Sequence, residues 1–125
     1  MKARVVLESP FAGSTEQERA RNMEYLRAAM RDCLLRGEAP FASHALYTQP
    51  GVLDDDVPDE RALGIEAGLS FLEAVDRSVV YVDLGVSEGM RQGIARARAL
   101  GLPVEERRLD AEVFERLTSK KGVSK

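Results

Sequence analysis

The sequence predicts an α/β fold whose sheet is mainly parallel. Short apolar segments rich in valine and leucine alternate along the 125 residues with longer segments in which apolar residues recur every three or four positions. Glycines end two of the helical segments, at Gly37 and Gly101. Strands that alternate with helices are joined by crossover connections, so they line up in parallel, and a chain of this length forms one domain with its own core.

The first strand is predicted over Ala3–Glu8, around a buried Val-Val-Leu centre. The next segment, Ser9–Gly13, breaks the strand because its proline removes a backbone donor and its glycine permits a turn. A helix then begins after Ser14 or Thr15, either of which can cap it, and runs to about Arg36. Its predicted apolar stripe comprises Met23, Leu26, Met30, Cys33 and Leu34.

Residues 38–57 are the least regular part of the chain. A short second strand is predicted within Pro40–Leu46, and Pro50-Gly51 is a strong turn signal. The acidic run Asp54–Asp56 is interpreted as a solvated turn. It lacks the alternating oxygen ligands and the glycine of a calcium-binding loop.

The second helix is predicted to begin at Pro58, with Asp56 as its cap, and to run to about Val75. Gly64 and Gly68 lie four residues apart on one face of it. Each glycine costs roughly 1 kcal/mol against alanine, so the pair indicates a close approach by another backbone or by a ligand. The residues that this helix is predicted to bury are Leu63, Leu69, Leu72 and Val75.

The stretch Arg77–Gly101 organises the rest of the chain. Val79–Val82 is typical of a strand buried on both faces, and a helix begins at Ser87 after a turn over Asp83–Val86. A strand, a loop and a helix N terminus together direct backbone N–H groups toward one place, where an anionic or polar ligand can bind. In a parallel sheet this crevice lies beyond the carboxyl ends of the strands, so we predict the functional site here. The apolar residues of this helix are Met90, Ile94, Ala97 and Leu100.

The last strand is predicted over Leu102–Arg107, and Asp110 is predicted to cap a short helix that follows it. The domain is expected to span residues 1–118, and residues 119–125 are expected to form a disordered polar tail. The apolar residues of the short helix are Val113, Phe114 and Leu117.

Composition excludes several classes of function. The net charge of −3 gives no electrostatic reason to expect binding to polymeric nucleic acid or to an acidic membrane. No apolar run approaches 18 residues and no signal peptide is evident, so a cytoplasmic location is expected. One cysteine and one histidine argue against a structural zinc site, and we predict no metal and no cofactor.

Three residues of the central stretch are candidates for chemistry, and each has a plain structural alternative. Ser87, followed by the turn at Gly89, can hold a phosphate or ribose, or it is an ordinary N-cap. Asp83 can accept hydrogen bonds from sugar hydroxyls, or it caps its own loop. Glu88 can act as a general acid or base if its pKa is raised, or it only interacts favourably with the helix dipole.

A second group of candidates comes from other parts of the chain. His44 has no serine, cysteine or aspartate at the spacing of a nucleophilic triad, so a structural, hydrogen-bonded histidine competes with a catalytic base. Tyr47 can stack on a base or cover the edge of the core. Four polar residues lie early in helices that follow strands, where they face the same crevice or the helix surface: Asn22, Tyr25, Glu60 and Arg61.

These motifs resemble the nucleoside 2-deoxyribosyltransferase-like superfamily, which includes the deoxynucleoside 5′-monophosphate N-glycosidases and many small phage and bacterial proteins of unknown function. The resemblance covers Ala3 to Arg107 and rests on SPFAG after the first strand, a long helix with an asparagine, and D-x-G-x-S-x-G-M before a small-residue helix. It implies a flavodoxin/Rossmann-like three-layer sandwich and a nucleoside or nucleotide pocket at the carboxyl ends of the strands. It also implies a homodimer or larger homo-oligomer in which a partner chain can complete the site.

The resemblance assigns roles to individual residues. The loop beside the sugar corresponds to Ser9, Pro10, Phe11, Ala12 and Gly13. Asp83 and Gly85 match the strand end of the signature, and Ser87, Gly89 and Met90 match its helix start, which binds phosphate in the monophosphate enzymes.

The catalytic position of the family is changed in this sequence. The active enzymes carry a nucleophilic glutamate after the Gly-Met pair or its equivalent, and this position is Arg91 here. An arginine cannot form a glycosyl-enzyme ester or stabilise an oxocarbenium ion as a carboxylate does. It can, however, bind phosphate as a bidentate donor.

Three functions are consistent with the sequence. The first is binding of a nucleoside or nucleotide without the family's catalytic glutamate, with Asn22, His44 and Tyr47 as further ligand contacts. The second is an N-glycosidase or deoxyribosyltransferase that acts on a (deoxy)nucleoside 5′-monophosphate, with Glu88 or Asp83 as a relocated acid. The third is an oligomeric interaction module in which the crevice has no ligand.

Overall fold

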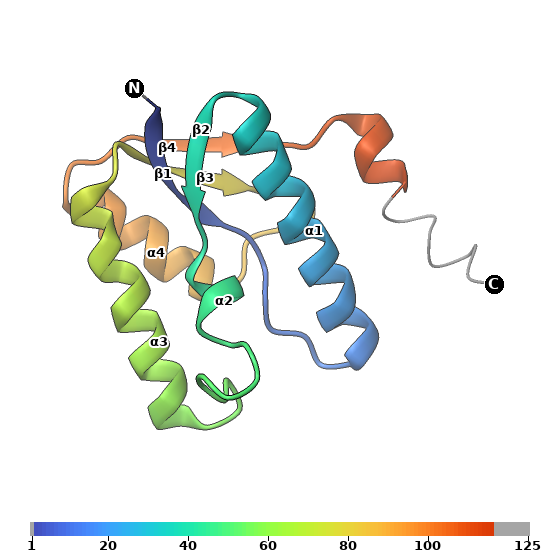
Figure 1. Ribbon diagram of the computed structural model, residues 1–125, viewed down its shortest axis with the longest axis vertical. Coiled ribbons are helices and arrows are strands. Elements are labelled where there is room, and N and C mark those ends of the chain that lie inside the picture. Colours follow the sequence, from blue (N-terminus) through green and yellow to red (C-terminus); the bar gives the residue numbers. More distant parts are fainter. Residues whose placement is uncertain (1, 117–125) are drawn as a thin grey trace.

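A four-stranded parallel sheet forms the middle layer of the computed structural model, which describes residues 2–116 (Figure 1). The spatial order of its strands is β2-β1-β3-β4. Both faces of the two central strands are covered, which explains why their centres are runs of apolar residues rather than alternating patterns. The strands are β1 (Ala3–Glu8), β2 (Glu38–Phe41), β3 (Arg77–Tyr81) and β4 (Val104–Arg107).

Helices cover both faces of this sheet (Figure 1). On one face, α1 (Glu16–Leu35) packs its Tyr25 and Leu26 against Leu7 of β1. The other face is covered by α3 (Pro58–Ser70), its 3₁₀ continuation η1 (Phe71–Ala74) and α4 (Glu88–Ala99), and there Val6 packs with Leu72. A single turn, α2 (Ser43–Leu46), lies between β2 and α3 in the chain. The predicted flavodoxin/Rossmann-like three-layer sandwich is therefore confirmed.

The strand order reverses between β1 and β3. From β1 the chain passes to β2 on one side, and then crosses back to β3 on the other side of β1. Open α/β sheets bind ligands beyond the carboxyl ends of the strands at such a point. The loop that follows β1 and the N terminus of α4, which follows β3, both begin there.

Several predicted helix ends are confirmed. Thr15 caps α1, since its Oγ1 accepts a hydrogen bond from the Glu18 amide (3.1 Å), and Ser87 caps α4 by accepting from the Met90 amide (3.3 Å). Gly101, which follows α4, adopts a positive φ of 79° that side chains rarely tolerate.

Two predictions about the irregular region are wrong. The second strand begins earlier than Pro40 and ends at Phe41, and Ser43–Leu46 is the helical turn α2. Asp56 does not cap α3. The N-cap is Val57, and the Asp56 amide instead donates to Asp54 Oδ1 (2.9 Å) in the preceding turn.

Two leucines predicted to be buried by helices are exposed. Leu34 is 55% exposed, because the buried face of α1 passes through its neighbour Cys33. Leu63 is 63% exposed, because α3 packs through its glycine face instead. A β-carbon on Gly68 would collide with Ser43 of α2, and one on Gly64 would lie 3.2 Å from Leu53 Cδ1. The two glycines were predicted to allow a close approach by another backbone or by a ligand, but it is side chains of α2 and of the loop after it that approach them.

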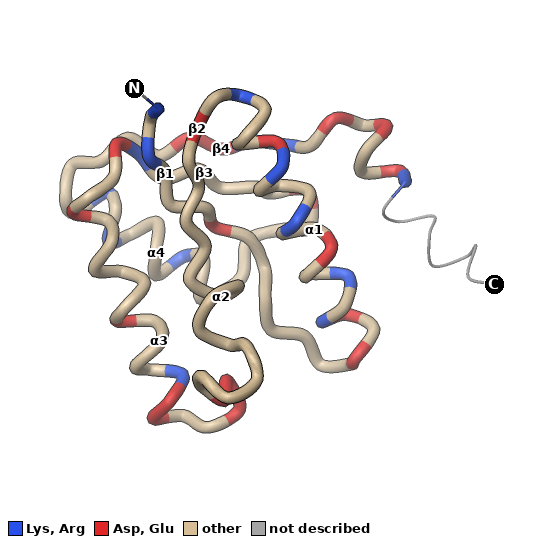
Figure 2. The backbone as a smooth tube through the Cα atoms, in the orientation of Figure 1, with Lys and Arg blue, Asp and Glu red and all other residues tan. Residues whose placement is uncertain are grey.

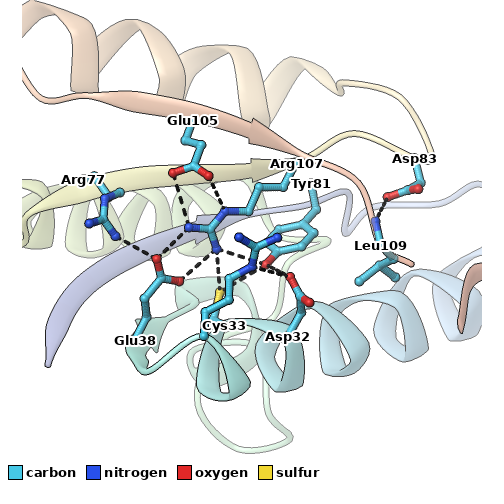
Figure 3. Close-up of polar contacts among 10 residues, drawn as sticks. Asp32, Cys33, Glu38, Arg77, Tyr81, Asp83, Glu105, Arg107 and Leu109 are labelled. Atoms are coloured by element: carbon cyan, nitrogen blue, oxygen red, sulfur yellow. Dashed lines mark hydrogen bonds and ion pairs between the residues drawn. The ribbon is translucent and has the colours of Figure 1, made fainter. Parts of the chain in front are cut away.

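A buried polar network connects the sheet to the C-terminal end of α1 (Figure 3). The Arg107 guanidinium is 4% exposed and donates to both carboxylate oxygens of Glu38 (2.6 and 2.8 Å) and to the Tyr81 hydroxyl (3.2 Å). The Tyr81 hydroxyl in turn donates to Asp32 (2.7 Å). Hydrogen bonding to Arg107 lowers the pKa of Glu38, so this carboxylate stays ionised. Beside it, burial raises the pKa of the Cys33 thiol and keeps it neutral.

The described part of the chain ends in a short helix. Residues 111–116 are helical, and Asp110 Oδ1 accepts a hydrogen bond from the Glu112 amide (2.8 Å), which confirms the predicted cap. Leu117, the domain boundary at 118 and the predicted tail over 119–125 lie outside the described residues. None of the helices within residues 2–116 has the length and apolarity needed to cross a membrane.

Candidate functional site

A cavity of about 250 Å³ lies where the strand order reverses. Its walls come from the end of β1 and the loop after it, from α2, from α3 with η1, and from the first two turns of α4. Parallel strands bring these segments together, although they are far apart in the sequence. The predicted location of the site, at the carboxyl ends of the strands, therefore coincides with a cavity.

The inner wall and the rim of this cavity differ in polarity. Val6, Leu72 and Met90 line it and are 6%, 1% and 2% exposed, so the inner wall is apolar. The rim carries the charged groups: Asp55, Arg61 and Glu88 line the cavity with side chains that are 27%, 41% and 76% exposed. A ligand with one flat, weakly polar end and one charged end matches this distribution.

Arg61 brings a positive charge to the N terminus of α4. Its Nη1 donates to Asp55 Oδ2 (3.0 Å), which orients the guanidinium. Its Nη2 lies 4.0 Å from the position that a β-carbon on Gly89 would take. The first amides of a helix have no intrahelical acceptor and carry the positive end of the dipole. The guanidinium and the helix end therefore converge on one side of the cavity, as in anion-binding sites. Figure 2 shows basic and acidic segments next to each other at the start of α3.

The loop Ser9–Gly13 forms a second wall, and Asn22 holds it in place. The Asn22 Nδ2 donates to the carbonyl oxygens of Phe11 and Ala12 (both 3.2 Å), and the residue is 3% exposed. Phe11 and Ala12 line the cavity, and together with Gly13 they also line an adjoining open hollow of about 570 Å³. Asn22 itself lines neither, so it positions the loop from behind.

His44 joins the β1 loop to α2. Its Nε2 lies 3.0 Å from Ser9 Oγ, and its ring meets Phe11 edge-on at 5.9 Å. Burial lowers the pKa of His44 to about 4, so the imidazole is neutral at pH 7. Both His44 and Ser9 line the cavity.

Glu8 is a cavity residue that the sequence analysis missed. It ends β1 two residues after Val6, so both side chains lie on the face of the sheet that is covered by α3 and α4. Its carboxyl lies against Gly93 of α4 and lines the cavity. Desolvation raises the pKa of Glu8 to about 8. The signal that could have identified Glu8 is a charged residue at the carboxyl end of a buried strand, an even number of positions after an apolar residue of the same face.

Asp83 lies on the opposite face of the sheet from the cavity. It follows β3 with the parity of Tyr81, whose side chain faces α1. Its Oδ1 accepts hydrogen bonds from the Tyr25 hydroxyl (2.6 Å) and from the Leu109 amide (3.0 Å; Figure 3). Burial and Asp83 together raise the pKa of Tyr25. The structure thus uses Asp83 to fix the loops after β3 and β4.

Other predicted residues also lie outside the cavity wall. Arg91 points outward, is 63% exposed and lies 3.5 Å from Glu88. Tyr47 lines an adjoining hollow of about 60 Å³, outside the cavity itself, and packs on Phe41, with ring centroids 6.3 Å apart. Gly85 turns the loop before α4 with φ of 94°. Pro10 is buried outside the wall, whereas Ser87, Glu88, Gly89 and Met90 all line the cavity.

Within residues 2–116, no three histidine, cysteine or acidic side chains lie together so that they could hold a metal ion. Asp55 of the acidic run pairs with Arg61, and Asp54 accepts a hydrogen bond from the Asp56 amide.

The chain is similar to one domain family and to solved structures of two enzymes. The sequence model of a domain of unknown function (DUF7768) matches residues 3–107. A 2-deoxyribosyltransferase from Bacillus psychrosaccharolyticus superposes with a TM-score of 0.59 at 17% identity, over 90% of this chain and 81% of that one. The CMP N-glycosidase BcmB of Clostridium botulinum gives a TM-score of 0.43 at 20% identity, over 93% of this chain and 80% of that one. No curated protein matches the sequence.

The first of these structures shows that the chain has a nucleoside 2-deoxyribosyltransferase-like fold, as its motifs predicted. At 17% identity the likeness establishes the fold, and the function has to be argued from the cavity.

Proposed function

The chain belongs to the DUF7768 family, a domain of unknown function, and we propose that it binds a nucleoside or nucleotide in the cavity at the carboxyl ends of β1 and β3. The observation that carries this proposal is the convergence of Arg61 and the N terminus of α4 on the rim of a cavity with an apolar inner wall. A phosphate fits the rim and a base fits the inner wall. The fold shared with a deoxyribosyltransferase adds support to this ligand class.

The phosphate contact is assigned to Arg61. Arg91 was the predicted phosphate ligand, but it does not line the cavity, and its exposed guanidinium lies 3.5 Å from Glu88. Arg61 is held by Asp55 through only one of its nitrogens, and a guanidinium has five N–H donors. A phosphate can therefore be bound by Arg61 while Asp55 keeps its orientation.

Calorimetric titration with the four 2′-deoxynucleoside 5′-monophosphates and the corresponding nucleosides tests this proposal. The monophosphates should bind more tightly, and Arg61→Ala should weaken their binding by roughly 1.5–3 kcal/mol, the usual contribution of a charged hydrogen bond. Nucleoside binding should change little. Arg98, an exposed arginine in the last turn of α4, provides the control variant Arg98→Ala. Loss of phosphate binding in Arg91→Ala but not in Arg61→Ala would contradict the assignment.

A second candidate function is cleavage of the N-glycosidic bond. Two carboxyl groups, those of Glu8 and Glu88, line the same cavity although position 91 is an arginine. Chromatography of a monophosphate incubated with the protein tests for release of free base. If base is released and Glu88→Gln retains full turnover, Glu88 is not the acid.

The assembly and the location of the protein stay predictions. A homodimer or larger homo-oligomer is expected, and light scattering of the purified protein measures its mass directly. The proposed location is the cytoplasm, which fractionation of cells expressing the protein tests.

A further inference from the structure

Glu8 brings a carboxyl group into the apolar part of the cavity. It ends β1 on the side that faces α4, and its carboxyl lies where a side chain at position 93 would otherwise be. Gly93 is buried, and the absence of a β-carbon there leaves the space that the carboxyl fills. Glu8 is half-buried and lines the cavity.

Within residues 2–116, no hydrogen bond or ion pair engages the Glu8 carboxyl; burial is the only cause of its altered pKa. An unpaired polar group in an apolar wall costs free energy, and such groups normally have a partner. A protein partner is missing here, so a bound ligand is the natural partner.

None of the other charged and titratable groups of the cavity serves as a partner for the Glu8 carboxyl. From the loop and from α3, Asp55 and Arg61 are paired with each other. From α2, His44 is neutral and bonds to Ser9. From α4, Glu88 is directed to the exposed rim near Arg91. Desolvation therefore dominates at Glu8, and its carboxyl is the neutral acid at pH 7.

We propose that Glu8 recognises the base of the ligand, and that its neutral carboxyl group donates one hydrogen bond and accepts another along the edge of that base. A protonated carboxyl offers an O–H donor next to a C=O acceptor, and the edge of a nucleobase offers neighbouring acceptor and donor atoms in return. This assignment rests on the proposed function. It adds the residue that recognises the base, and it makes binding depend on the proton of the Glu8 carboxyl group.

The polarity of the cavity favours the base over the other parts of a nucleotide as the partner of Glu8. Val6, Leu72 and Met90 line the same inner region, where a flat base gains free energy from apolar contact. A phosphate instead requires the cationic rim near Arg61, because an anion is costly in an apolar wall.

Calorimetric titration of wild type and variants across pH tests the proposal, with deoxyadenosine and deoxycytidine 5′-monophosphate as probes and deoxyribose 5-phosphate as the ligand without a base. Wild-type affinity for the nucleotides should fall about tenfold from about pH 7 to about pH 9, as Glu8 loses its proton. Glu8→Gln keeps a donor and an acceptor but cannot titrate, so its affinity should stay constant. Glu8→Ala should bind the nucleotides at least tenfold more weakly and deoxyribose 5-phosphate as tightly as wild type does.

The control is Glu73→Gln, which removes a carboxyl from the exposed surface of η1 and should reproduce the wild-type profile. Unchanged nucleotide affinity in Glu8→Ala, or an unchanged pH dependence in Glu8→Gln, would overturn the role of Glu8 and leave nucleotide binding intact. If Glu8→Ala fails to fold, the pH dependence of nucleotide affinity in Glu8→Gln tests the role of Glu8 by itself. If the wild-type protein binds none of the probes, the proposed function itself fails.

Discussion

The carboxyl group of Glu8 occupies the volume that a side chain on Gly93 would fill, so β1 and α4 share one space in the wall of the cavity. A helix interior favours alanine over glycine by roughly 1 kcal/mol, so the glycine is unfavourable for α4 itself. The arrangement instead leaves room for an acid at the bottom of the cavity. The two residues therefore depend on each other for space, and a substitution at one of them should change the effect of a substitution at the other.

Gly93→Ala should stabilise the protein only when Glu8 is shortened. In the wild-type background the new methyl group collides with the carboxyl and displaces it, which offsets the gain in helix propensity. In a Glu8→Ala background the same change should raise the free energy of unfolding by up to about 1 kcal/mol. Urea denaturation of the four proteins in this cycle measures the coupling.

Gly89→Ala is the matched control for this cycle. A β-carbon at this position would have only Arg61 Nη2 within 4.0 Å, so the substitution should behave identically with and without Glu8. Equal effects of Gly93→Ala in both backgrounds would mean that the two residues do not compete for space.

Glu8 should make the protein less stable at alkaline pH. Burial raises its pKa from 4.5 to about 8, so the folded state binds more protons than the unfolded state between these values. The contribution of Glu8 to the free energy of unfolding therefore falls as pH rises through this window. In Glu8→Gln this contribution is removed, so its Tm should exceed that of wild type at pH 9 by more than at pH 5. A Tm difference that is the same at pH 5 and pH 9 would argue against the raised pKa.

His44 should limit stability on the acid side. Burial lowers its pKa from 6.5 to about 4, so the unfolded state binds more protons in this interval, and stability falls as pH drops from 6.5 to 4. Glu8 has the opposite effect on stability above pH 4.5, so the two contributions offset each other in wild type between pH 4.5 and 6.5, and the test has to compare wild type with His44→Gln. In thermal melts the Tm of wild type relative to that of His44→Gln should fall as pH drops from 6.5 to 4. Glu38, whose pKa is lowered from 4.5 by Arg107, loses its contribution below that pH in both proteins. A Tm difference between the two proteins that is the same at pH 6.5 and at pH 4.5 would contradict the assignment.

Arg107→Met should be among the most destabilising single substitutions, by about 3–5 kcal/mol, because it leaves the carboxylate of Glu38 buried and without its closest partner. Adding Glu38→Met should recover much of the loss, since an apolar pair of similar size often replaces a buried ion pair at little cost. Chemical denaturation measures both. A loss under about 1 kcal/mol in the single variant would mean that Arg77, whose Nη1 lies 2.7 Å from Glu38 Oε2, or water replaces the lost partner.

Local sequence signals predicted the elements with a strong period or a clear cap. The buried run of β1, the Ser87 cap and the glycine after α4 each specify their own geometry, and each is confirmed. The second strand was misplaced because β2 is short and gains its structure by pairing with β1. Leu63 was misassigned because the inward face of α3 carries glycines, which a hydrophobic pattern does not register.

The site was predictable in place but less so in its residues. Ser87 and Gly89 follow from the strand-loop-helix pattern, and the cavity includes them. Asp83 and Glu8 both end central strands, and only side-chain parity separates them: Asp83 shares the face of Tyr81, and Glu8 shares the face of Val6. Arg61 lies on α3, which reaches the cavity through tertiary packing, so the spacing of residues in the sequence could not predict that its side chain lies near Gly89.

The most direct test of the central claim is a thermal-shift screen of the purified protein against nucleosides, 5′-monophosphates and dinucleotides, with chromatography of each mixture for free base. A ligand that binds only the folded state raises the Tm, and at one hundred times its Kd the stabilisation is about 2.7 kcal/mol. The account predicts a clear rise in Tm with at least one 5′-monophosphate and a smaller rise with its nucleoside. No shift with any of them, and no base released, would contradict the account and favour a protein whose cavity has no nucleotide ligand.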